Sequence, residues 1–244
     1  MGFIAALYGF VCYVVFLGSF LYAIGFVGNL IVPKAIDSGP STALPEALVI
    51  DLVLLGLFAV QHSVMARPGF KAAWTRIVPR SVERSTYVLF SSLLLALIYW
   101  KWQAIPTVVW DVTSPPLNAL LLVLFALGWL ILLLSTFMIN HFDLFGLRQV
   151  YLRARGLEYT PLNFTQKAFY KFVRHPIMLG FVIAFWATPH MSVGHLVFSI
   201  ATTGYILVGI FLEERDLVKY HSAEYQAYRA RVPMLFPTGV KNRH

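Results

Sequence analysis

The sequence predicts an all-α polytopic integral membrane protein with four spanning helices, a C-terminal helical hairpin and a cytoplasmic tail helix. Hydrophobic residues make up 59% of the 244 residues and charged residues only 12%. This balance leaves too little polar surface to cover a water-soluble globule. Several charge-free runs also approach the roughly 20 helical residues that cross the hydrocarbon core of a bilayer. We therefore expect one membrane domain over residues 1–244, embedded in the lipid bilayer.

The N-terminal helices occupy residues 1–140 in this interpretation. Pro, Gly and charged residues cluster between the apolar runs as turn signals, which places the four spans at about 3–32, 46–65, 85–104 and 117–140. The remaining region, 141–244, contains a run from Pro176 to Leu212 without Asp, Glu, Lys or Arg, broken in its middle by polar residues. We interpret 176–212 as a hairpin with a short first arm. A hairpin returns the chain to the side that it left, so the tail shares a face with residues 141–176.

The basic residues predict the orientation in the membrane. Of the 19 Lys and Arg residues, all but Lys34 and Lys101 fall in segments 66–86 and 141–175 or in the tail. Cytoplasmic loops carry an excess of Lys and Arg. We therefore expect a bacterial inner membrane protein with both termini and the active site on the cytoplasmic side. The net charge of +8 then reflects topology and indicates no nucleic-acid partner.

Metal and nucleotide chemistry have no support in the sequence. Cys12 is the single cysteine and lies inside the first apolar run, which excludes a disulfide framework and a thiolate metal site. We also find no metal-ligand spacing, phosphate loop or dinucleotide fingerprint. The sequence therefore predicts a site without a metal ion.

The entry to the hairpin is the first candidate site. A residue before proline avoids the helical region, so His175 should lie just ahead of a helix that begins at Pro176. The free amides of that helix and Arg174 attract an anion, such as the carboxylate of an amino-acid-like cofactor. Glu213 and Glu214 lie at the other end of the hairpin, opposite Arg174, and could hold an ammonium group or ribose hydroxyls. The alternatives are a basic membrane anchor and a salt bridge that closes the hairpin.

A second group of polar residues follows the fourth span. His141 and Asp143 could act as a base and its orienter, but side chains two positions apart face each other only if a helix ends there. An interfacial cap is the alternative. His62, at the cytoplasmic end of the second span, could supply another titratable ring or simply lie at the membrane interface. His190 and His195 fall in the hairpin tip on the opposite face, where we assign them no role.

The last third of the chain resembles the superfamily of isoprenylcysteine carboxyl methyltransferases and phospholipid methyltransferases. The resemblance rests on Arg174-His175-Pro176 through Gly180, on Glu213-Glu214, on Glu224-Tyr225-Gln226-Ala227-Tyr228, and on Val232-Pro233 before Pro237. It implies a small helical membrane enzyme whose S-adenosylmethionine pocket includes Arg174, His175, Pro176, Gly180, Glu213 and Glu214. Residues 220–224 depart from the pattern, since the superfamily usually has a glycine before its Glu-Tyr.

The whole chain is similar to the bacterial membrane methanethiol S-methyltransferases. The matching strings are Gln61-His62-Ser63-Val64-Met65-Ala66-Arg67, Glu83-Arg84-Ser85, the segment from His141 to Gln149, and Phe185-Trp186-Ala187-Thr188-Pro189. The similarity implies methyl transfer from S-adenosylmethionine to methanethiol, a small thiol, which gives dimethyl sulfide and S-adenosylhomocysteine.

Methyl transfer to a thiol suggests roles for the second group of residues. A thiol attacks as the thiolate, and a free cysteine thiol titrates only near about 8.5. His141 is therefore our expected base, with Asp143 as its orienter. His62 or Arg148 would stabilise the thiolate, and an aromatic face such as that of Phe145 could attract the sulfonium.

Two other functions remain open from the sequence. A methyltransferase for a lipid or isoprenylcysteine-type substrate would suit the same fold, and pocket volume would separate the two because a lipid needs a groove open between helices. The second alternative is a non-enzymatic, denitrification-associated membrane protein, whose pattern shares the second-span and mid-chain strings. A charged cytoplasmic pocket favours the enzyme over this alternative.

Overall fold

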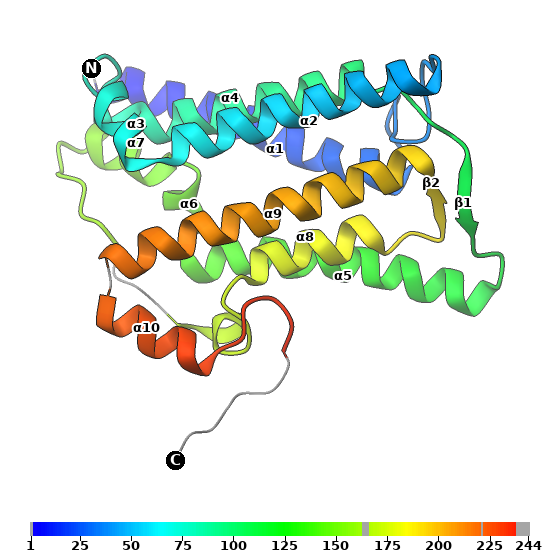
Figure 1. The fold of residues 1–244 in the computed structure, drawn as a ribbon. Coiled ribbons are helices and arrows are strands. Elements are labelled where there is room, and N and C mark those ends of the chain that lie inside the picture. Colours follow the sequence, from blue (N-terminus) through cyan, green and yellow to red (C-terminus); the bar gives the residue numbers. More distant parts are fainter. Residues whose placement is uncertain (1, 163–165, 221, 238–244) are drawn as a thin grey trace. The chain divides into compact units, whose positions relative to one another are not determined.

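The computed structural model describes residues 2–162, 166–220 and 222–237 and is almost entirely helical (Figure 1). Five of its helices are long and apolar enough to cross a membrane: α1 (Gly2–Gly28), α2 (Leu44–Ala66), α4 (Arg80–Lys101), α5 (Pro115–Ile139) and α9 (Val193–Tyr220). The shorter helices are α3 (Pro68–Trp74), α6 (His141–Leu144), α7 (Leu147–Ala154), the 3₁₀ helix η1 (Ala168–Lys171), α8 (Pro176–Trp186) and α10 (Ser222–Arg231). The strands β1 (Val108–Asp111) and β2 (His190–Ser192) form a two-stranded sheet. The predicted all-α membrane fold is confirmed.

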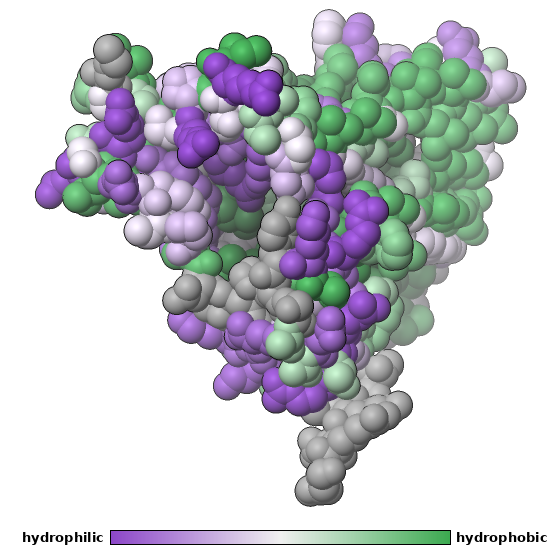
Figure 2. Space-filling model, turned by 60° about the vertical axis from the view of Figure 1, so that its left-hand side comes forward, coloured by the Kyte–Doolittle hydropathy of each residue, from purple (hydrophilic) through white to green (hydrophobic). Residues whose placement is uncertain are grey.

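The surface of the long helices fits a lipid environment. On α2, Val49, Val53 and Val60 are all more than half exposed. Figure 2 shows hydrophobic side chains over a broad area of the surface, with hydrophilic side chains gathered away from it. In water this much exposed apolar surface would be unfavourable, whereas lipid tails solvate it.

Local backbone chemistry explains where the spans differ from the predicted bounds. We expected the first span to reach residue 32, but α1 ends at Gly28 because Asn29 has a positive φ of 51°, a common way to end a helix. Helix α4 begins already at Arg80, directly after Pro79, which stands at its N-cap. Charged residues tolerate a helical conformation outside the apolar core, so hydropathy alone places the start too late.

The chain divides into two compact units, which we describe separately. The first contains residues 2–108, 140–162 and 192–195. In it α1, α2 and α4 lie side by side (Figure 1), and the Ser19 hydroxyl of α1 donates to the Ser92 carbonyl of α4 at 3.2 Å. Gly9 allows α7 to pack on α1, because a Cβ there would lie 2.6 Å from a methyl of Val150. The prediction of a single domain stays a prediction.

The second unit contains residues 109–139, 166–191, 196–220 and 222–237. Its helices α5 and α8 touch through glycines, because a Cβ on Gly180 would lie 2.6 Å from the carbonyl oxygen of Gly128. Helices α8 and α9 form the predicted hairpin: the Ser199 hydroxyl donates to the Phe185 carbonyl at 2.8 Å. The first arm is short, with 11 residues, as the sequence indicated.

The second arm is longer than predicted. We expected it to end at Leu212 and a separate tail helix to start near Asp216, but α9 continues to Tyr220 and α10 follows from Ser222 to Arg231. Every residue between Leu212 and Tyr220 is compatible with a helix, so nothing in the chain ends α9 where the apolar run stops. Glu213 and Glu214 consequently lie within α9. The sequence departure at residues 220–224 includes His221, which lies outside the described residues.

Candidate active site

The ends of the hairpin are joined by a buried ion pair in the second unit. Arg174 Nε donates to Glu214 Oε1 at 2.7 Å, and the two side chains are only 10% and 8% exposed. The same carboxylate oxygen lies 3.1 Å from His175 Nε2, and Glu214 Oε2 lies 3.3 Å from Arg229 Nε. Glu214 therefore holds the segment before α8, helix α9 and helix α10 together.

Arg174 is fixed by further hydrogen bonds. Its Nη1 donates to the carbonyls of Arg229 and Val232 at 3.0 and 2.8 Å, and its backbone amide donates to the Pro233 carbonyl at 2.9 Å. The salt bridge that we considered as an alternative is thus present. Glu213 differs from its neighbour, because its side chain is 49% exposed while Oε2 lies 3.5 Å from His175 Nδ1. Among the predicted carboxylates, Glu213 is the one accessible to a ligand.

His175 stands just ahead of α8, and Pro176 is the first residue of that helix, as predicted. Burial by itself lowers the pKa of His175, but hydrogen bonds and negative charge from Glu213 and Glu214 outweigh burial and raise the pKa above its ordinary value. The imidazolium is therefore favoured next to the two carboxylates. Gly180, the last member of the predicted cofactor group, lies one turn further on and faces the backbone of α5.

His141 belongs to the first unit and lies at a helix end, which is the condition that a role for both His141 and Asp143 required. Helix α5 ends at Ile139, and the Asn140 side chain caps α6 by accepting from the Asp143 amide at 3.1 Å. His141 is 5% exposed, and this burial lowers its pKa. The ring is consequently neutral at neutral pH and able to accept a proton.

The side chain that the structure brings to His141 is Tyr13 of α1. The Tyr13 hydroxyl lies 2.9 Å from His141 Nε2. The carboxylate of Asp143 instead accepts from Arg148 at 2.9 Å and from Tyr159 at 3.3 Å. Sequence reasoning missed Tyr13, because a tyrosine within an apolar run gives no pattern and its partner is 128 positions away.

His62 is held between α2 and α4. Its Nε2 lies 2.8 Å from the Tyr87 hydroxyl and its Nδ1 lies 3.1 Å from the Ser91 hydroxyl. Tyr87 belongs to a buried cluster with Met65 and Val88, against which Phe16 and Phe145 pack. These two phenylalanine rings stack with their centroids 3.9 Å apart, and the Phe145 ring is 4.8 Å from the His141 ring. Both predicted histidines therefore border the same aromatic cluster.

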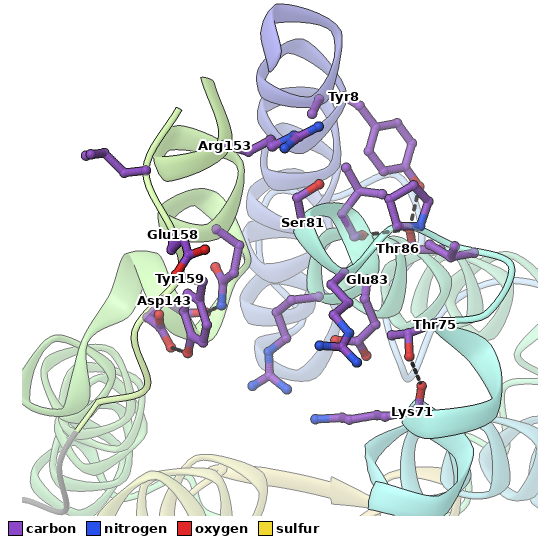
Figure 3. Close-up of a pocket in the computed structure, with 18 of the residues that line it drawn as sticks. Tyr8, Lys71, Thr75, Ser81, Glu83, Thr86, Asp143, Arg153, Glu158 and Tyr159 are labelled. Atoms are coloured by element: carbon purple, nitrogen blue, oxygen red, sulfur yellow. Dashed lines mark hydrogen bonds between the residues drawn. The ribbon is translucent and has the colours of Figure 1, made fainter. Parts of the chain in front are cut away.

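A cavity of 1610 Å³ opens in the same unit (Figure 3). Residues from α1, α3, α4 and α7 line it, together with Asp143 and Tyr159. Figure 3 shows Asp143, Glu158 and Tyr159 on one side of this cavity and Lys71 and Thr75 on the other. Its size exceeds what a small thiol needs, and its charged lining does not fit lipid tails. The volume criterion therefore assigns this cavity to neither acceptor.

Comparison with known proteins identifies the family. The methanethiol S-methyltransferase of Mycobacterium tuberculosis is 56% identical to the chain over 96% of both chains. The chain belongs to the methanethiol S-methyltransferase family. Another member of this family, from Crocosphaera subtropica, is 56% identical over 95% of this chain and 91% of its own. These relatives confirm the predicted enzyme class, a methyltransferase.

Two more distant matches surround this family. The family described as NnrU protein matches residues 51–234, which include the strings that the sequence shares with the denitrification-associated alternative. Nurim of Rattus norvegicus is 31% identical over 70% of this chain and 68% of its own. No solved structure matches the chain. The fold described above is therefore argued from this chain alone.

Proposed function

We propose that this chain transfers a methyl group from S-adenosylmethionine to methanethiol and releases dimethyl sulfide and S-adenosylhomocysteine. The observation that carries the proposal is the near full-length identity of 56% to a methanethiol S-methyltransferase. The protein would work in the bacterial inner membrane with its active site and both termini on the cytoplasmic side. The concentration of Lys and Arg in segments 66–86, 141–175 and the tail supports this orientation.

Residues of the second unit fit an amino-acid-like cofactor. Half-exposed Glu213 can accept hydrogen bonds from an ammonium group or from ribose hydroxyls. The amides at the start of α8 suit a carboxylate. Arg174, His175 and Glu214 would act mainly by fixing these two elements, because their own bonds are already made within the protein. Pro176 would start α8 at the cofactor, and Gly180 would let α8 pack on α5. The bound cofactor supplies a methyl group on a positively charged sulfur and leaves as a neutral thioether.

Residues of the first unit fit the activation of a thiol. Neutral His141 accepts the S–H proton as the sulfur forms its new bond to the methyl carbon. Asp143 holds Arg148 in a fixed position at 2.9 Å, where the guanidinium can stabilise negative charge. His62, bound to Tyr87 and Ser91, is a second group that can donate to a thiolate. The rings of Phe16 and Phe145 provide faces that attract a sulfonium.

Headspace gas chromatography tests the reaction directly. Purified protein in detergent is given S-adenosylmethionine and methanethiol, with boiled protein as the control. We expect dimethyl sulfide in proportion to the amount of protein. If the cofactor binds but no dimethyl sulfide forms, the thiol assignment is wrong and a lipid-like acceptor takes its place.

We expect Tyr13→Phe to slow turnover while leaving cofactor affinity unchanged. The substitution removes the hydroxyl at His141 Nε2, and a hydrogen bond of about 0.5–1.5 kcal/mol corresponds to a roughly three- to tenfold fall in kcat. Tyr22→Phe is the matched control, since Tyr22 lies on the same helix and loses a comparable bond, to the Lys34 carbonyl. Equal effects of the two substitutions on kcat would show that Tyr13 acts only through the packing of α1.

The pKa of His175 predicts how stability depends on pH. A raised folded-state pKa means that the protonated ring stabilises the fold below its ordinary pKa of about 6.5, and this contribution disappears as pH rises through the raised value. We therefore expect the midpoint of thermal unfolding to fall as the pH is raised through and above about 6.5. His175→Gln should flatten this dependence. An unchanged slope in that variant would assign the pH dependence to other groups.

A further inference from the structure

The cavity of the first unit gathers basic side chains that the proposed reaction does not use. Lys71 comes from α3, Arg80 and Arg84 from the first turns of α4, and Arg153 from α7. Within the described residues, no carboxylate pairs with Lys71, Arg80 or Arg153. Figure 3 shows the Lys71 side chain extending from α3 toward the middle of the cavity. These cations are therefore available to an anionic ligand.

The electrostatics of the cavity favour a negative charge despite its acidic residues. Burial and the neighbouring charge of Arg84 lower the pKa of Lys71, so an anion nearby would offset both effects. Asp143, Glu83 and Glu158 also line the cavity. The charge of Asp143 is balanced by Arg148 at 2.9 Å. The two remaining glutamates face four basic groups, which leaves a net positive cavity.

The cavity lies where membrane-crossing helices end. Ile4, Ala5 and Tyr8 belong to the first turns of α1, and Arg80 is the first residue of α4. Ile4, at the rim, is 71% exposed. An apolar rim beside a basic cavity at the end of candidate spans matches the depth at which phospholipid headgroups meet their acyl chains.

We propose that this cavity binds the phosphate-bearing headgroup of an anionic phospholipid, with Lys71, Arg80 and Arg84 as the groups that hold the phosphate. Arginine can bind a phosphate through two parallel N–H bonds, while lysine contributes a point charge. Arg84 is already oriented, since its Nε donates to the Leu144 carbonyl at 2.8 Å. The volume of 1610 Å³ accommodates a headgroup and leaves room for its glycerol.

Binding is measured by isothermal titration calorimetry on the full-length protein in detergent, with dihexanoyl-phosphatidylglycerol as the probe. Dihexanoyl-phosphatidylcholine and inorganic phosphate serve as comparison ligands. We expect phosphatidylglycerol to bind most tightly. Lys71→Gln combined with Arg80→Gln should weaken this binding by tenfold or more, since each basic residue at a membrane surface contributes roughly fivefold.

Two further variants keep the test sharp. Arg76→Gln makes the same change of charge in the same segment at an exposed position outside the cavity, and it should leave the affinity unchanged. Glu83→Gln removes a repelling charge from the lining and should tighten binding about fivefold, which tests the site even if the double variant does not fold. Equal affinities for phosphatidylglycerol and phosphatidylcholine, or equal weakening by Arg76→Gln, would overturn the proposal. Inorganic phosphate binding as tightly as phosphatidylglycerol would exclude the lipid as the source of the phosphate.

Discussion

Replacing His141 with alanine is expected to lower kcat at pH 7 by about a hundredfold or more, which is the range that a positioned general base contributes. The burial that lowers the pKa of His141 keeps its ring neutral at this pH, so the wild-type protein already has its base in the active form. Cofactor affinity should not change, because Arg174, His175 and Glu213 make no use of this ring. Dimethyl sulfide production and calorimetric binding of S-adenosylmethionine measure the two effects separately.

The pH profile of the same variant distinguishes a base from a packing residue. Without His141 the protein depends on thiolate formed in solution, so the rate should rise roughly tenfold per pH unit up to the pKa of the thiol. The wild-type rate should stay flat at neutral pH and fall only below the lowered pKa of His141. His190→Ala is the matched control, since His190 lies in the hairpin tip and its ring faces Asp111. A parallel profile for His141→Ala and wild type would contradict the role of base.

The sequence predicted the membrane-spanning elements well because hydropathy reports burial in lipid directly. It was less accurate where hydropathy is silent. The positive φ of Asn29 ends α1 early, and helix-forming residues beyond Leu212 extend α9 to Tyr220. Both depend on local backbone preferences that act after the lipid-facing pattern has ended.

The candidate site shows the same division between short-range and long-range information. Hairpin topology alone places Arg174 and Glu214 at the same end of the hairpin, and the structure brings them to 2.7 Å. The pattern could not decide between a ligand and a salt bridge, because burial decides it and burial depends on how α10 covers the pair through Arg229. Tyr13 beside His141 is a contact between distant helices, and no periodicity in either helix indicates it.

The burial of that ion pair leads to the second large effect. Glu214→Ala leaves Arg174, which is only 10% exposed, without its carboxylate, and His175 and Arg229 lose the same partner. Removing one member of a buried ion pair typically costs about 3–5 kcal/mol. We expect the free energy of unfolding to fall by roughly that amount in chemical denaturation in detergent. Cofactor affinity should fall as a consequence, because the start of α8 and helix α9 are no longer held together.

Glu213→Ala is the matched control for this prediction. Its side chain is 49% exposed, so an ion pair there is worth about 0–1 kcal/mol and stability should barely change. Cofactor affinity should nevertheless drop, since Glu213 is the carboxylate that a ligand can reach. A double variant with leucine at both Arg174 and Glu214 should recover much of the stability lost in Glu214→Ala, because no buried charge remains unpaired. If Glu213→Ala were the less stable protein and Glu214→Ala only a weaker binder, the structural and ligand-binding roles of the two carboxylates would have to be exchanged.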